Sequence, residues 1–428
     1  MWQKISSFKF SFFGKPVSFK DAVSHPVFAG SAIMVFGSNV ANFFASIYHF
    51  VIGRMLDPNQ YGELATTITF ISLVITSLSF LSIVVVKFIS SSKAQAQKAV
   101  ISWFSLASIF IGVGIAVLLV ALAPFTSKFF HIHQSIMYVV APIVGLFIVS
   151  MALKSILQGL LMFLPNVLST NVQIITRLAL GVIAVYLGWE VAGALVGFLI
   201  ALVLEIMVML YYLRNILVLK FKIKLKNKLS IFKYAIPTLF STFSVNSLIS
   251  TDVLLAKHHL SSFDAGIYAA LSTLGKIIFF GTAPIASVMF PLIAKKYSER
   301  KNSNDIFLIS MSMTVLVCLG VTFIYFLFPK LVINILYGDK YLIAANQLYL
   351  FGIFISVYTI GALMLNYFLS RDDTKVVVIP LIAAFVQYIL IRLYNESILQ
   401  IVVMSTISVC VMTFGFVLYF LLKKYKFL

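Results

Sequence analysis

Five ionisable side chains interrupt the long apolar runs of this sequence: Lys154, Arg177, Glu205, Asp252 and Lys276. A charge at the centre of a bilayer costs about 2.5–3.5 kcal/mol on insertion scales, so such a side chain should face a water-filled cavity or an opposite charge. Three cations stand against two acids, and this excess favours a cavity that binds an anionic group. We expect Arg177, Lys276 and Lys154 to line a central cationic cavity.

The two acids admit a second arrangement, in which the buried charges pair with each other. Glu205 is a candidate partner of Lys154 or Arg177, and this alternative stays open. We expect Glu205 and Asp252 to have a structural role or to serve in gating or in coupling to an ion, rather than to contact the ligand.

Uncharged polar residues form a second set of candidates. Asn42 and Asn246 lie in the middle of two apolar runs, where an amide most often hydrogen-bonds to a neighbouring helix. Recognition of a polar ligand is the less favoured role for these two amides. Gln158 is a further candidate for a polar cavity wall.

The sequence contains no recognisable set of residues for catalysis, ATP hydrolysis or metal binding. It has no evident group of nucleophile, base and orienting acid, and no GxxxxGK[ST] phosphate loop. The pairs His131/His133 and His258/His259 have no acid or cysteine at metal-ligand spacing. We therefore predict a protein that is not an enzyme and needs neither a cofactor nor a metal.

Apolar runs long enough to cross a bilayer make up most of the chain. Hydrophobic residues account for 61% of the sequence and charged residues for 11%, with a mean hydropathy of +1.06, whereas a soluble protein has about 25% charged residues. A spanning helix needs about 20 apolar residues. The predicted spans are 28–52, 64–86, 99–122, 136–161, 166–188, 191–213, 234–256, 265–294, 305–328, 345–369, 376–394 and 398–422. Because only helices satisfy their own backbone groups in lipid, we predict an all-α integral membrane protein with about twelve transmembrane helices.

Lys and Arg are concentrated in alternate gaps between the spans. By the positive-inside rule, this pattern places both termini and the basic segment 220–230 on the cytoplasmic side of the inner (cytoplasmic) membrane. Basic segments there should rest on anionic lipid headgroups. The net charge of +19 is spread among these gaps, which argues against nucleic-acid binding. The predicted division is a basic tail (1–27), an N-lobe (28–214), a basic linker (215–233), a C-lobe (234–422) and a second tail (423–428).

The two predicted lobes repeat each other at an offset of 204 residues. Identical residues at this offset include Leu56 and Leu260, Gly62 and Gly266, Asn42 and Asn246, and Ser46 and Ser250. Six spans in each half give both halves the same orientation, so we predict two six-helix lobes related by a pseudo-two-fold axis along the membrane normal. In this arrangement the ligand lies between the lobes, which rock against each other. Gly62 and Gly266 are predicted to set tight turns at the outer face.

Five segments carry a resemblance to known proteins. They are GRMLDPNQYGEL (53–64), LKSILQGL (153–160), DVLLAKHHLSSFDAGIYAA (252–270), MFPLIAKKY (289–297) and NILYGDKYLIAANQLYLF (334–351). In this order they resemble the signatures of O-antigen-type oligosaccharide flippases. These flippases belong to the polysaccharide transporters of the multidrug/oligosaccharidyl-lipid/polysaccharide exporter superfamily. The resemblance covers residues 26–422, and the basic extension before Pro26 departs from it.

This resemblance implies translocation of undecaprenyl-diphosphate-linked sugar units from the inner to the outer leaflet, for surface polysaccharide biosynthesis. The diphosphate would be the anion in the cationic cavity, because Arg and Lys are natural phosphate partners. Membrane lipids, a coupling ion such as H⁺ or Na⁺, and polysaccharide polymerase machinery are the partners that this interpretation suggests.

Two other classes remain as alternatives. A small-molecule or cation antiporter of the multidrug type is compatible with the same fold, but three buried cations would repel cationic drugs. A membrane glycosyltransferase or polymerase would need clustered carboxylates and large outer loops, whereas the outer loops here are short.

Overall fold

The computed structural model describes residues 9–12, 15–18, 26–90, 94–217, 240, 243–371 and 373–424. These residues form helices joined by short turns, apart from an antiparallel hairpin of β1 (Lys9–Phe12) and β2 (Lys15–Ser18). The hairpin falls within the predicted N-terminal tail. The rest of residues 1–25, the linker from 218 to 233 and the last four residues lie outside the described part of the chain.

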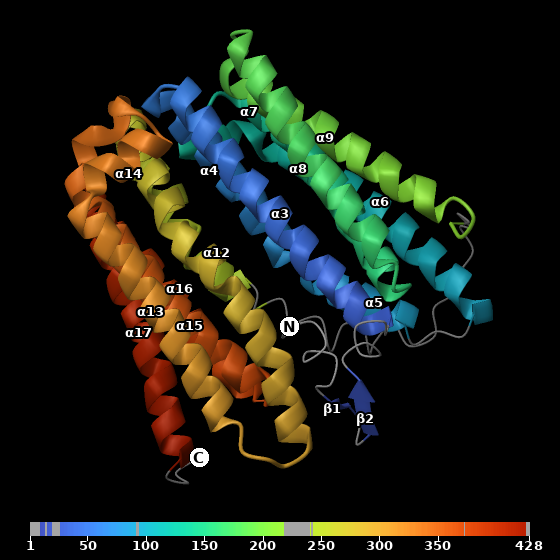
Figure 1. The fold of residues 1–428 in the computed structure, drawn as a ribbon. Helices are drawn as coiled ribbons and strands as arrows, with labels where there is room; N and C mark the ends of the chain where they lie inside the picture. Colours follow the sequence, from blue (N-terminus) through green and yellow to red (C-terminus); the bar gives the residue numbers. More distant parts are fainter. Residues whose placement is uncertain are drawn as a thin grey trace, which may run out of the picture.

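The first lobe, the N-lobe, is drawn from blue to green in Figure 1. Its helices are α3 (Pro26–Met55), α4 (Pro58–Ser77), α5 (Phe80–Ser90), α6 (Ala94–Phe130), α7 (Gln134–Gly159), α8 (Phe163–Tyr186) and α9 (Glu190–Leu213). The second predicted span is therefore divided between α4 and α5, which are separated at Leu78 and Ser79.

The second lobe, the C-lobe, is drawn from yellow to red. Its elements are α11 (Thr251–His259), α12 (Ser262–Ser298), α13 (Asn304–Leu327), α14 (Pro329–Leu336), the 3₁₀ segment η1 (Asp339–Gln347), α15 (Leu348–Leu369), the 3₁₀ segment η2 (Thr374–Val377), α16 (Val378–Leu393) and α17 (Ile398–Lys424). Helical residues 243–247 and α11 cover the end of the seventh predicted span.

The structure confirms an all-α membrane protein with two lobes. Within the described residues, nine helices are long and apolar enough to cross a membrane. The other three predicted spans correspond to α3, to α4 with α5, and to the segment that ends in α11. Many apolar side chains on the outer surfaces of both lobes remain exposed, such as Phe110, Leu316 and Phe414. Lipid is the environment that such a surface requires.

The lobes meet at one end of the molecule and diverge toward the other (Figure 1). At the meeting end, here called the closed end, the Tyr61 and Tyr337 hydroxyls hydrogen-bond at 2.8 Å, and the Tyr341 hydroxyl donates to the Gly53 carbonyl at 3.1 Å. Lys340 and Asp57 add an exposed ion pair of 2.6 Å. The hairpin and the end of α17 lie toward the opposite end, here called the open end.

Gly62 and Gly266 join the lobes through a direct contact between two helices. Both residues lie inside helices, in α4 and α12, and neither has a positive φ, so the predicted tight turns are wrong. A Cβ atom on Gly62 would lie 2.8 Å from the Cα atom of Gly266, and one on Gly266 would overlap the Pro58 carbonyl oxygen. Glycine is needed here because two helix backbones cross in contact.

Candidate functional site

A cavity of about 370 Å³ lies between the lobes. Its walls come from α3 and α4 of the N-lobe, and from residues 246–253 and α12 of the C-lobe. Pockets of about 300–1,000 Å³ between structural units are the usual size and place for a small-molecule site. This cavity is therefore the first candidate for ligand binding.

Repeat-equivalent residues face each other across this cavity. Three polar pairs at the offset of 204 line it, here called the collar: Asn42 with Asn246, Ser46 with Ser250, and Thr69 with Thr273. The pair Ala65 and Ala269 also lines it. The pseudo-two-fold axis that relates the lobes must therefore pass through the cavity. Each lobe supplies one amide and two hydroxyl groups, which both donate and accept hydrogen bonds.

The charged positions break this symmetry. His49 of the N-lobe corresponds to Val253 of the C-lobe, and Lys276 of the C-lobe corresponds to Ser72 of the N-lobe; all four side chains line the cavity. No Asp or Glu contributes to the lining among the residues described. His49 lies within electrostatic range of Lys276. The cavity therefore has a basic corner in an otherwise neutral polar wall.

His49 is a cavity residue that was not among the site residues predicted from the sequence. An imidazole inside an apolar run is itself a signal of a cavity, because ionisable residues in transmembrane segments usually face the protein interior or water. Its Nδ1 atom is buried and has no hydrogen-bond partner in the described structure. Lys276 is half-buried and forms no ion pair with a described residue.

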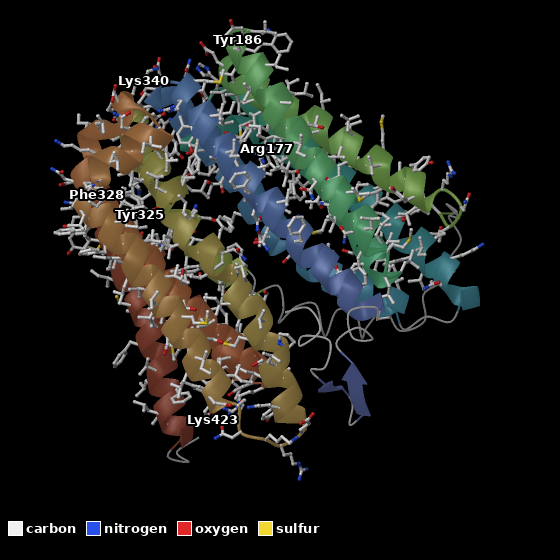
Figure 2. All side chains as sticks on the ribbon, viewed as in Figure 1. Arg177, Tyr186, Tyr325, Phe328, Lys340 and Lys423 are labelled. Carbon is white, nitrogen blue, oxygen red and sulfur yellow. The ribbon has the colours of Figure 1, made fainter. Side chains whose placement is uncertain are left out.

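Arg177 lies outside the cavity lining, within the N-lobe (Figure 2). Its guanidinium carbon lies 4.2 Å from the centre of the Tyr48 ring and 4.1 Å from that of Phe198. Two cation–π contacts of this kind partly replace the water that a buried cation loses. The Nε and Nη2 atoms have no hydrogen-bond partner in the described structure. The charge of Arg177 is nevertheless close enough to interact with that of His49, which does line the cavity.

Lys154 and Glu205 form an ion pair of 2.7 Å between α7 and α9. The Ser150 hydroxyl donates to the second Glu205 carboxylate oxygen, also at 2.7 Å. This is the internal pairing that the sequence left open, and it lies away from the cavity between the lobes. Gln158 is exposed near the end of α7 and does not line the cavity either.

Asp252 is completely buried inside the C-lobe. The Tyr268 hydroxyl donates to its Oδ2 atom at 3.0 Å, whereas Oδ1 has no partner in the described part of the chain. Two polar atoms on α16 and α17, Gln387 Oε1 and Ser405 Oγ, are likewise buried without a partner there. A buried carboxylate with a free oxygen needs a cation or a proton.

At the closed end, pKa shifts follow from burial. Burial lowers the pKa of Lys257, and the Glu63 carboxylate opposes this effect. Burial, His258 and Arg392 together lower the pKa of His259. Burial raises the pKa of Tyr337 well above its usual range, so its hydroxyl stays neutral in the contact with Tyr61.

Comparisons with known proteins agree with this architecture. The family model described as "Polysaccharide biosynthesis protein" matches residues 27–297. A search of curated proteins found no match. Among solved structures, the lipid II flippase MurJ in an inward closed conformation aligns with a TM-score of 0.68 at 16% identity, over 90% of this chain and 87% of that one.

Two further solved structures show the same fold. An inward-facing multidrug resistance MATE family transporter of the MOP superfamily aligns with a TM-score of 0.68 at 13% identity, over 89% of this chain and 96% of that one. A MOP superfamily transporter from Pyrococcus furiosus, described as having a binding pocket of reverse polarity, aligns with a TM-score of 0.64 at 14% identity, over 94% of this chain and 97% of that one.

Proposed function

The chain belongs to the polysaccharide biosynthesis protein family, and from this premise we propose that it translocates undecaprenyl-diphosphate-linked oligosaccharide units from the inner to the outer leaflet of the cytoplasmic membrane. The observation that carries the proposal is the cavity wall. It joins a collar of amides and hydroxyls to a basic corner at His49 and Lys276, with no acid among the described lining residues. Sugar hydroxyls match the collar, and a phosphate matches the corner.

The proposed direction of transport follows from the charges and the shape. Cytoplasmic loops of membrane proteins usually carry the excess of Lys and Arg, and this rule supports an open end that faces the cytoplasm. In the state described here, a lipid-linked sugar would enter from the inner leaflet, and the contacts at the closed end would block its exit. Separation of the closed end and approach of the lobes at the open end would complete the transfer.

Asp252 is the proposed coupling residue. It lies in the C-lobe interior and is close enough to Lys276 for the two charges to interact. Binding of H⁺ or Na⁺ to this carboxylate would remove the charge that partly balances Lys276. The change would alter the affinity of the basic corner for an anion, which is how an ion gradient would act on the ligand.

A multidrug-type antiporter is the competing function on this fold. Cationic drugs require an acid in the cavity, and the acids Asp252 and Glu205 both lie outside the lining. The charge of Lys276 would repel a cationic drug at short range. The wall of the cavity therefore favours an anionic, hydroxyl-rich ligand.

Reconstitution tests the proposal directly. Purified protein in liposomes should move a fluorescent polyprenyl-diphosphate saccharide between leaflets, measured as the fraction accessible to a membrane-impermeant quencher. Lys276→Ala should slow the movement about tenfold or more, while Lys330→Ala, at an exposed lysine of α14, should leave it unchanged. Movement of a lipophilic cation with none of the diphosphate lipid would replace the flippase with the antiporter.

A further inference from the structure

A second cavity, of about 360 Å³, lies at the closed end and is separate from the collar. The start of α4, the turn between α6 and α7, and the turn between α8 and α9 form its N-lobe walls. The C-lobe closes it with Lys257 at the end of α11 and Ser262 at the start of α12. None of the residues predicted as site residues lines this pocket.

The pocket is lined by the buried cation Lys257 and by the Glu63 carboxylate, which form no ion pair with each other. The Lys257 side chain belongs to a residue only 2% exposed, and its ammonium group donates one hydrogen bond, to the Ser262 hydroxyl at 3.1 Å. Glu63 accepts the backbone N–H of His133 at 2.7 Å. No ion pair joins Lys257 to Glu63, although their charges interact. An ammonium group has three donors, so Lys257 retains donors for a ligand.

An aromatic ring and a strained backbone form the rim of the pocket. Trp189 is 59% exposed and contributes to the lining. Its neighbour Glu190 has a φ of 47°, and His131 across the pocket has a φ of 50°. A non-glycine residue in the left-handed region costs about 1–3 kcal/mol and persists where surrounding structure holds it, often at ligand sites. Both strained residues line this pocket.

We infer that this pocket binds a carbohydrate, namely the sugar portion of the lipid-linked substrate on the outer side of the membrane. Amide groups of Asn59 and Gln60, with Glu63 and Lys257, supply donors and acceptors side by side, as vicinal sugar hydroxyls require. The exposed indole of Trp189 offers an apolar face to a sugar ring. This assignment of the ligand rests on the proposed function.

Both lobes are needed to build the site. Lys257 and Ser262 come from the C-lobe and the other lining residues from the N-lobe, so separation of the closed end takes the pocket apart. A ligand that binds only one of two states stabilises that state. Saccharide bound from outside would therefore hold the closed end together and favour the return of the empty transporter to the open-inward state.

Tryptophan fluorescence gives a direct test. The sequence has three tryptophans, Trp2, Trp103 and Trp189. In purified protein carrying Trp2→Phe and Trp103→Phe, emission reports on Trp189 alone. Titration with glucose, galactose, N-acetylglucosamine and glucuronate should give a saturable change in emission with at least one of them. A linear or absent response to all four would overturn the inference.

Variants identify the pocket as the source of the signal. Adding Glu63→Gln and Lys257→Met should abolish the saturable response, since Gln keeps an acceptor for His133 and Met keeps the buried stem. Glu396→Gln, at an exposed turn between α16 and α17, is the matched control and should retain it. The double variant should match the parent in thermal stability, so that loss of the response is due to the pocket and not to unfolding. An unchanged response in the double variant would also overturn the inference.

The central cavity gives an independent control. Lys276→Ala should slow transport about tenfold or more but leave the Trp189 response intact, because Lys276 lines the other cavity. Loss of the saccharide response together with normal transport of the diphosphate lipid would reject this pocket and leave the proposed function standing. A saccharide response in a protein that moves no diphosphate lipid would reject the proposed function instead.

Discussion

The two lobes present the same polar groups to the central cavity but different charges. Asn42, Ser46 and Thr69 have identical counterparts at Asn246, Ser250 and Thr273, whereas Ser72 faces the cavity where the C-lobe has Lys276. A symmetric collar can hold a neutral, hydroxyl-rich group in either of two related positions. The single lysine removes this equivalence and gives a ligand with one anionic end a preferred orientation.

The largest expected effect comes from preventing the lobes from moving relative to each other. Asn59 of the N-lobe and Ser262 of the C-lobe line the same pocket at the closed end. Asn59→Cys with Ser262→Cys, in a background without Cys318 and Cys410, should form a disulfide on oxidation and stop transport completely. Reduction should restore transport. Full activity of the oxidised protein, with the disulfide verified by mass spectrometry, would show that the closed end need not open.

The second prediction tests the unequal charges. Lys276→Ala should lower the transport rate about tenfold or more, in line with the ~1.5–3 kcal/mol of a hydrogen bond to a charged group. Ser72→Ala should have a much smaller effect, because it removes only a neutral hydroxyl. Initial rates of quencher accessibility in liposomes measure both variants.

The double variant Ser72→Lys with Lys276→Ser moves the charge to the equivalent position in the other lobe. Its transport should remain slow, because the C-lobe residue equivalent to His49 is Val253, so the moved lysine has no imidazole opposite it. Transport restored by this exchange would mean that the net charge of the cavity matters and its position does not.

The third prediction concerns the crossing of α4 and α12, to which each lobe contributes one glycine at an equivalent position. Gly62→Ala and Gly266→Ala should each disfavour the closed end by about 1–3 kcal/mol, the usual cost of overpacking. Spin labels on α4 and α12 would report longer distances at this end. Gly281→Ala is the matched control, since it lies in the same helix α12 and a Cβ atom added there would meet no other atom within 4 Å. Equal spectra for all three variants would contradict the contact.

The smallest effects are expected from the polar contacts at the closed end. Tyr61→Phe removes the hydrogen bond to Tyr337 and should shift the same equilibrium by about 0.5–1.5 kcal/mol. Lys340→Ala breaks an exposed ion pair and should shift it by about 0–1 kcal/mol. A larger effect of Lys340→Ala than of Tyr61→Phe, measured with the same spin labels, would reverse the assigned ranking.

The sequence predicted the spans and the repeat because both depend on residue type and order alone. Apolar length determined which segments become helices. The offset of 204 identified Asn42 and Asn246 as equivalent positions, although the favoured role for these amides was a hydrogen bond to a neighbouring helix rather than a place in a cavity wall. Which way a helical side chain points depends on how its helix is rotated against its neighbours. Arg177 therefore lies between two aromatic rings of the N-lobe rather than in the cavity lining.

The glycine pair shows a second limit of prediction from sequence. A glycine before a long apolar run is as compatible with a turn as with a close contact between helices. Only the packing of α4 on α12 distinguishes these two roles. The pocket at the closed end could not be predicted from the sequence either, because Glu63, Trp189 and Lys257 come from segments far apart in the chain.

The matched collar has a consequence for ligand selectivity. A sugar bound as proposed here would meet the same chemical groups at Asn42, Ser46 and Thr69 as on the opposite lobe. Hydrogen bonds lost on one lobe would be replaced by bonds of the same kind on the other, because amides and hydroxyls both donate and accept. Such a wall would impose no single pose on the sugar, and it would accept sugars that differ in the orientation of a hydroxyl group.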